Sequence, residues 1–222
     1  LAALLPTSGM TISWTGFARG NLGAAVKMTV LGLILGSLAT PLYVRWLMGA
    51  EVPVDMVAVF MQIVIIVFLP MVAGHFTQKW LVARYGQAQY QKEWGPRFPP
   101  FSTLGVLGIV FVALALKARD LVAQPGELFV VLVPLLCLYA INYLVSTVVA
   151  RSLLPRGDAI ALVYGTVMRN LSIALALAMN AFGSASSGAA LVIALAYILQ
   201  VQSAAWYVKL TDRLFGPAVP PA

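Results

Sequence analysis

The sequence predicts an all-α integral membrane protein, and three observations support this fold class. Of the 222 residues, 61% are hydrophobic and 9% are charged, whereas a soluble domain carries about 25% charged residues. The apolar residues gather in runs, most of which reach the ~20 residues that a membrane-spanning helix needs. The ten-residue alternating segments of a membrane β-barrel do not occur in the sequence. Two of the apolar runs combine helix-weakening residues with polar or charged side chains, so interrupted helices are expected there.

Seven apolar runs are expected to be helical spans, each ending at polar or turn-forming residues. The first is interrupted by Pro6-Thr7-Ser8-Gly9 and ends at Arg19-Gly20-Asn21, and the sixth contains Gly165 and a charge, Arg169. The third continues as an amphipathic tail to residue 85. Residues 86–100 are polar with two prolines at their end, and are expected to form a loop. In order, the expected spans are 1–17, 22–48, 54–73, 101–116, 127–150, 159–182 and 189–210.

The basic residues predict how these spans are oriented. If the spans alternate across the membrane, ten Lys and Arg residues fall on one side and three on the other. Loops rich in Lys and Arg are typically cytoplasmic. This bias predicts a multi-pass protein of the plasma (inner) membrane with a cytoplasmic tail at 211–222, and it explains the net charge of +7 without a nucleic-acid partner. Because Leu1 lies within an apolar run, we also expect spans upstream of it.

Arg169 is the most informative residue of the sequence. A charge at bilayer depth costs at least ~2.5 kcal/mol, and such charges normally face a cavity or a partner. Small and polar residues surround it, which is typical of the interrupted helices that hold a solute in transporters. Alternatively, Arg169 satisfies carbonyl groups at the break or pairs with an acid outside this sequence, and the residues around Pro6 merely kink their helix. The candidate substrate-binding residues at the two breaks are Thr7, Ser8, Thr11, Thr166, Arg169, Asn170 and Ser172.

The two interrupted spans run in opposite directions. The first descends to the turn at Arg19, and the sixth ascends to an uncharged turn at Gly183; each is followed by one more span. Opposed interrupted helices are the signature of an inverted repeat whose breaks meet near the membrane midplane. Residues 1–48 are then the last two spans of a first repeat, with a break around 6–13, and residues 54–210 form a second repeat of five spans, with a break around 164–173.

At both breaks the sequence resembles the bile acid:sodium symporter superfamily, which includes the arsenite-efflux permeases. The first break, from Pro6-Thr7-Ser8-Gly9-Met10 to Trp14, resembles the fourth span of that family, and Met168-Arg169-Asn170-Leu171-Ser172 resembles the ninth. Met10 and Trp14 favour the arsenite-permease branch. The resemblance implies a ten-span fold with two inverted five-span repeats and two crossing broken helices, of which this chain supplies spans four to ten.

The sequence departs from that family at the positions that bind ions. Thr7 stands where the arsenite permeases have a cysteine, and Ser172 where they have a glutamate. Gly165 stands where the sodium symporters have a glutamate, and Thr11-Ile12 replaces their Ser-Asn pair. The thiolate that suits a metalloid and the carboxylate that suits sodium are therefore both missing at these positions.

These observations predict a secondary transporter of an anionic or oxyanionic solute, similar to arsenic-resistance efflux permeases; the alternative is a sodium-coupled organic anion symporter. No cofactor or metal is expected, and the coupling ion is left open between sodium and proton. An enzyme is not expected, because one His and one Cys leave little from which to build a catalytic centre. A channel would need rings supplied by repeated subunits. His75 is expected at the surface, Cys137 as a buried packing residue, and Asn142 and Tyr143 as partners in interhelical hydrogen bonds.

Overall fold

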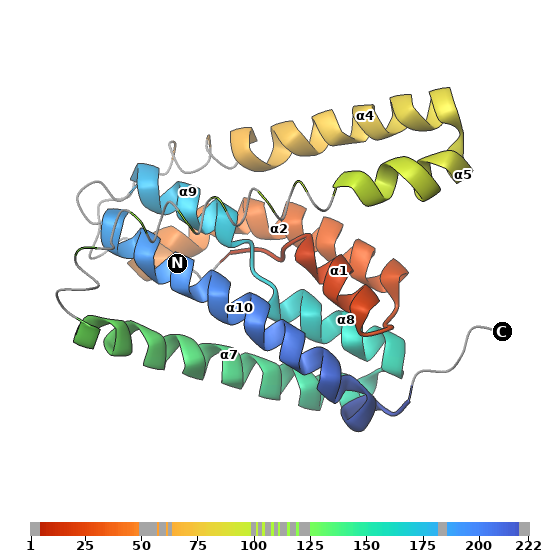
Figure 1. Cartoon of the computed structure of the whole chain (residues 1–222). Coiled ribbons are helices and arrows are strands. Elements are labelled where there is room, and N and C mark those ends of the chain that lie inside the picture. Colours follow the sequence, from red (N-terminus) through yellow and green to blue (C-terminus); the bar gives the residue numbers. More distant parts are fainter. Residues whose placement is uncertain are drawn as a thin grey trace.

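The protein is a bundle of helices in the computed structural model (Figure 1), which describes residues 5–48, 57, 61, 64–98, 101, 104, 108, 111, 115, 119, 125–181 and 186–217. Every regular element among these residues is helical. Three of the helices contain segments long and apolar enough to cross a membrane: Leu22–Thr40, Phe129–Leu153 and Gly188–Phe215. The all-α class predicted from composition is confirmed.

The N-terminal part contains an extended segment and two helices. Residues 5–9 are not helical, because Pro6 and Gly9 disfavour a helix there. Helix α1 (Met10–Phe17) follows, and a turn in which Arg19 has φ of 53° leads to α2 (Leu22–Met48). The bounds of α2 agree with the expected second span. Within the described residues 5–17 of the expected first span, the helix is limited to Met10–Phe17.

Four helices form the C-terminal part: α7 (Pro125–Leu153), α8 (Arg156–Val167), α9 (Leu171–Ala181) and α10 (Ser186–Phe215). The expected sixth span is divided between α8 and α9, with a break at residues 168–170, as predicted. Helix α10 continues past the predicted end at Leu210. The expected fourth span, 101–116, lies outside the described residues except at isolated positions.

A helical hairpin lies beside this bundle in Figure 1. It consists of η1 (Val64–Phe68), α4 (Leu69–Tyr85), α5 (Gln87–Gln89), η2 (Tyr90–Trp94) and η3 (Gly95–Arg97). The chain reverses at Gly86, whose φ of 83° suits a glycine. The prediction of a loop over residues 86–100 is therefore wrong: helical turns continue as far as Arg97. They satisfy the backbone of a polar segment locally, which composition alone does not reveal.

The core lies around α8 and α9, which pack against α7, α10 and α2. Its largest fully buried side chains include Tyr164, Ile160 and Met168. The outer faces of α2 and α7 instead expose large apolar side chains, as expected for helices that face lipid. Cys137 lies on the exposed face of α7, so its predicted burial is wrong. Val133 and Ile141, one turn before and after it on the same face of α7, are also exposed.

Candidate functional site

The two interrupted segments cross each other in the centre of the bundle. Thr7 and Arg169 form an isolated antiparallel β-bridge. The bridge is closed by two backbone hydrogen bonds of 2.8 Å, from the Ser8 N–H to the Met168 carbonyl and from the Asn170 N–H to the Pro6 carbonyl. Each strand thus satisfies polar groups that the break leaves without helical partners.

Two helices begin directly after this crossing. The N–H of Met10, at the start of α1, donates to Ser8 Oγ over 3.2 Å, and the N–H of Ile173 in α9 donates to Asn170 Oδ1 over 3.3 Å. Helix N-termini carry a partial positive charge, since their first N–H groups lack helical acceptors. Both N-termini therefore add positive potential at the point where the two chains cross.

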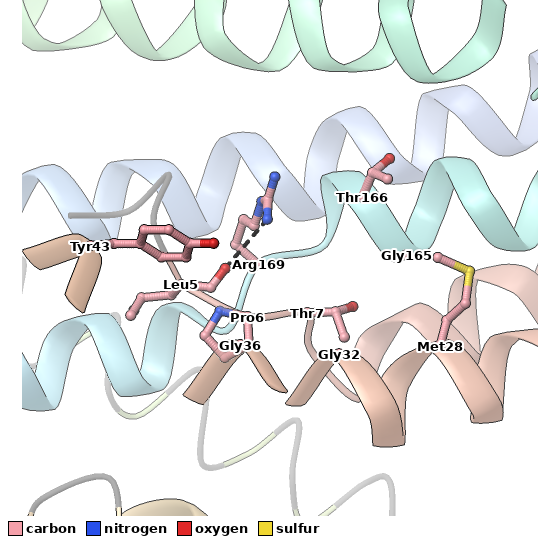
Figure 2. A pocket seen from close by; sticks show the side chains of 10 residues that line it. All are labelled: Leu5, Pro6, Thr7, Met28, Gly32, Gly36, Tyr43, Gly165, Thr166 and Arg169. Atoms are coloured by element: carbon pink, nitrogen blue, oxygen red, sulfur yellow. Dashed lines mark hydrogen bonds between the residues drawn. The ribbon is translucent and has the colours of Figure 1, made fainter. Parts of the chain in front are cut away.

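A cavity of about 330 Å³ opens beside the crossing, on the side of α2 (Figure 2). This volume falls within the range of small-molecule sites. Its polar side chains include Thr7, Thr166 and Arg169, and the phenol oxygen of Tyr43 points toward Arg169 in Figure 2. Its lining consists of Leu5, Pro6, Thr7, Met28, Gly32, Gly36, Tyr43, Gly165, Thr166 and Arg169.

The guanidinium of Arg169 is half-buried at this cavity and incompletely paired. Nη1 donates to the Leu5 carbonyl over 3.4 Å. Nε is buried and has no hydrogen-bond partner among the described residues. The salt bridge found in the described part of the chain joins Arg156 to Asp212, and no carboxylate there lies within ion-pair distance of Arg169. A buried donor without a partner costs about 1–3 kcal/mol or more.

The seven candidate residues do not all lie at the cavity. Thr7, Thr166 and Arg169 line it. Thr11 is fully buried behind Thr7: its hydroxyl lies 2.9 Å from Thr7 Oγ1 and donates to the Tyr164 carbonyl over 3.3 Å.

The remaining three candidates bond to neighbours around the crossing. Ser8 and Asn170 accept the helix-start bonds described above. The Ser172 hydroxyl is paired with the Tyr197 hydroxyl of α10. The crossing therefore brings all seven residues into one region, and their direct role in binding stays a prediction.

Several residues of the site were missed from the sequence. The lining contributed by α2 was not anticipated, although Gly32-Leu-Ile-Leu-Gly36 has the spacing that lets membrane helices be approached closely. Gln200, fully buried on α10, contacts the backbone of Arg169. A polar side chain in the apolar run of α10 was the signal that could have found it.

The other polar residues singled out by sequence have ordinary surroundings. Asn142 Nδ2 on α7 donates to the Thr166 carbonyl over 3.3 Å, and the Tyr143 hydroxyl lies 3.5 Å from the Ser203 hydroxyl of α10. Both interhelical hydrogen bonds were predicted. His75 is exposed on α4, also as predicted. Across the described ranges, no three His, Cys, Asp or Glu side chains gather closely enough to hold a metal ion.

The sequence of this chain matches the SBF-like CPA transporter family over residues 1–212. It is 24% identical over 216 residues to an uncharacterized transporter of Synechocystis sp., covering 96% of this chain and 56% of that protein. It is 22% identical over 215 residues to the arsenical-resistance protein Acr3 of Alkaliphilus metalliredigens, covering 96% of this chain and 60% of that protein. The chain therefore spans somewhat more than half the length of these relatives.

Proposed function

The chain belongs to the SBF-like CPA transporter family, and on this basis we propose that it carries an anionic or oxyanionic solute across the membrane by secondary transport. It is a multi-pass membrane protein, and the named relatives include a transporter and an arsenical-resistance protein. We further propose a ten-span inverted-repeat fold, of which these residues supply seven spans, and alternating access at the crossing.

The observation that carries this proposal is the position of Arg169. Its cationic side chain lines the cavity at the crossing of the two non-helical segments, with one donor unpaired among the described residues. Two helix N-termini adjoin the same point and favour negative charge. A bound anion beside the guanidinium would offset the cost of a cation at membrane depth.

Arsenic-resistance-like efflux is the first candidate, and a specific observation also favours the organic-anion alternative. Thr7 presents a hydroxyl to the cavity, not the thiolate that binds trivalent arsenic well. Leu5, Pro6 and Met28 supply an apolar wall, which would suit the carbon skeleton of an organic anion better than a bare oxyanion. The experiment must therefore include solutes of both kinds.

The test measures uptake and efflux in vesicles that hold the full-length protein. The panel is labelled arsenite, arsenate, acetate, pyruvate and taurocholate, each with and without a sodium or a proton gradient. Arg169→Ala should abolish transport yet fold, while Arg169→Lys should retain weak transport, because lysine keeps the charge and loses the planar fork. Arg151→Ala, which removes an exposed charge at the end of α7, is the matched control.

Thermal unfolding in detergent separates binding from folding. The Arg169→Ala protein should unfold at or above the temperature of the native protein, because an unfavourably buried cation has been removed. Normal transport by Arg169→Ala would reject the anion site. Failure of that variant to fold would instead favour a structural arginine that satisfies carbonyls at the break.

A further inference from the structure

The backbone of Arg169 is left unsatisfied by its own strand pairing. The two hydrogen bonds of the bridge are made by the residues that flank Thr7 and Arg169. Thr7 and Arg169 are therefore a non-hydrogen-bonded pair of an antiparallel ladder. The N–H and C=O groups of such a pair point away from the partner strand. The N–H and C=O of Arg169 therefore face outward from the crossing. The Arg169 carbonyl accepts the N–H of Leu171, at the start of α9, over 3.0 Å, whereas no backbone acceptor is seen for the Arg169 N–H among the described residues.

The side chain of Gln200 occupies this outward edge. The Arg169 N–H donates to Gln200 Oε1 over 2.9 Å, and Gln200 Nε2 donates to the Arg169 carbonyl over 3.1 Å. The side-chain amide thus takes the place of the backbone N–H and C=O groups that a third strand would offer to Arg169. Its orientation is determined by chemistry, since a backbone N–H can only donate and a carbonyl can only accept.

The amide of Gln200 is itself held in place from a second helix. The Tyr139 hydroxyl of α7 donates to Gln200 Oε1 over 3.1 Å and lies 3.3 Å from the Ala196 carbonyl. Gln200 has no exposed surface. Tyr139 and Arg169 are the titratable or charged residues that contact its amide among the described residues. Both polar atoms of the amide have partners, and a buried network of this kind favours one geometry.

The opposite edge of the crossing has no such clamp from α2. There the Thr7 segment lies against Gly32 and Gly36, which present no side chain. The cavity is on this side, and Gln200 is not among its lining residues. Gln200 therefore contacts Arg169 only through its backbone, from outside the cavity that the guanidinium lines.

We propose that Gln200 is the positioning residue of the site: by clamping the Arg169 peptide to α10, it sets the direction in which the guanidinium faces the cavity. The role in transport rests on the proposed function, whereas the clamp is a property of the fold. Without the amide, the Arg169 N–H loses its acceptor, and the Arg169 peptide is held only by the flanking bridge bonds and the Leu171 N–H. The direction of the guanidinium is then less firmly fixed.

Gln200→Glu tests the clamp with a reversible change. A protonated carboxyl offers one acceptor and one donor, as the amide does. An ionised carboxyl has no donor for the Arg169 carbonyl and places a negative charge beside the cation that should attract the solute. Transport of whichever anion the native protein moves should be within about threefold of native at pH 5 and should fall at least about tenfold relative to native by pH 8, since about 1.4 kcal/mol is lost with one bond to the clamp.

Two further variants complete the transport measurement. Gln200→Met has a similar volume and no amide, so its transport should be low at every pH. Gln202→Glu, two residues along α10 at an exposed position, should follow the native pH profile. A Gln200→Met protein that transports like native at both pH values would overturn the proposal.

Hydrogen exchange provides a readout that does not depend on transport. At one fixed pH in detergent, the Arg169 amide hydrogen should exchange at least about tenfold faster in Gln200→Met than in the native protein. In Gln202→Met its exchange rate should equal that of the native protein. Equal exchange in native and Gln200→Met would reject the clamp. If the native protein moves none of the anions while exchange changes as expected, the proposed function fails and the assignment of Gln200 as the clamp stands.

Discussion

A Cβ atom placed on Gly36 would lie 2.5 Å from the Cβ of Pro6. The extended segment before α1 therefore crosses α2 at a point where α2 has no side chain. Gly32, one turn earlier, is approached in the same way by Thr7, whose Cγ2 would lie 2.8 Å from an added Cβ. These two glycines let the crossing strand lie against the helix backbone, and both line the cavity.

Gly36→Ala is expected to destabilise the protein and to reduce transport. The clash involves a proline ring next to the backbone, which no change of rotamer relieves, so the strand must move. Overpacking of this kind costs about 1–3 kcal/mol, more than the ~1 kcal/mol that alanine gains over glycine in a helix. The free energy of unfolding in detergent and vesicle transport measure the two effects.

Two glycines serve as matched controls for this variant. A Cβ on Gly165 would also meet an atom at 2.5 Å, but that atom is the terminal Cε of Met28, which can rotate away. Gly165→Ala should therefore cost less stability than Gly36→Ala. Gly74→Ala on α4, with nothing within 4 Å, should be neutral or stabilising. Equal losses at Gly36 and Gly165 would contradict the argument.

Arg156 is expected to contribute more to the free energy of unfolding than its ion pair with Asp212 would by itself. Its Nε donates to the Gly216 carbonyl over 2.8 Å and its Nη1 to the Arg19 carbonyl over 2.8 Å, so it ties the ends of α1 and α10 to the start of α8. Its partner Asp212 is 63% exposed, and exposed pairs contribute about 0–1 kcal/mol. Arg156→Met should thus lower the unfolding free energy by about 2 kcal/mol or more, and Asp212→Ala by less than about 1.

Thermal unfolding of both variants, with Arg151→Ala as the charge control, distinguishes the two contributions. Arg156→Lys should lie between native and Arg156→Met, because an ammonium cannot reach several carbonyls at once as the guanidinium fork does. A larger loss in Asp212→Ala than in Arg156→Met would show that the ion pair, and not the carbonyl contacts, holds this end together.

Thr7→Cys is expected to preserve or raise arsenite resistance in an arsenic-sensitive cell. Thr7 lines the cavity, and a thiol there would supply the soft ligand that trivalent arsenic prefers. The measurement is the arsenite concentration that halts growth, with Thr7→Ser as the control without sulfur. Because Cys137 lies on the outer face of α7, Cys137→Ser should change nothing; loss of resistance in that variant would make the lone cysteine a ligand.

The orientation predicted from basic residues is tested by labelling. In a Cys137→Ser background, Gln87→Cys in the helical hairpin should react with an impermeant thiol reagent from the cytoplasmic side. Ser187→Cys, at the start of α10, should react from the opposite side, because the surrounding turn lacks the Lys and Arg typical of cytoplasmic loops. Reaction of Ser187→Cys only from the cytoplasm would reject the alternation of seven spans.

Local chemistry explains what could be predicted from the sequence. The break after Leu5 and the break around Arg169 were visible because proline, glycine and a buried charge are costly inside an apolar helix wherever they occur. The bounds of α2 followed from hydropathy alone. The hairpin after Gly86 was missed because polar residues are common both in loops and in exposed helical turns.

The sequence by itself determined that this is a helical membrane protein with two interrupted spans and a charge at one of them. Only the tertiary structure decided what surrounds that charge. The bridge joins residues 7 and 169, and the clamp joins residues 169 and 200. The role of Gly32 and Gly36 becomes clear only from the strand that packs against them. No local pattern encodes such pairings, because they depend on which distant polar groups remain unsatisfied after each helix has formed.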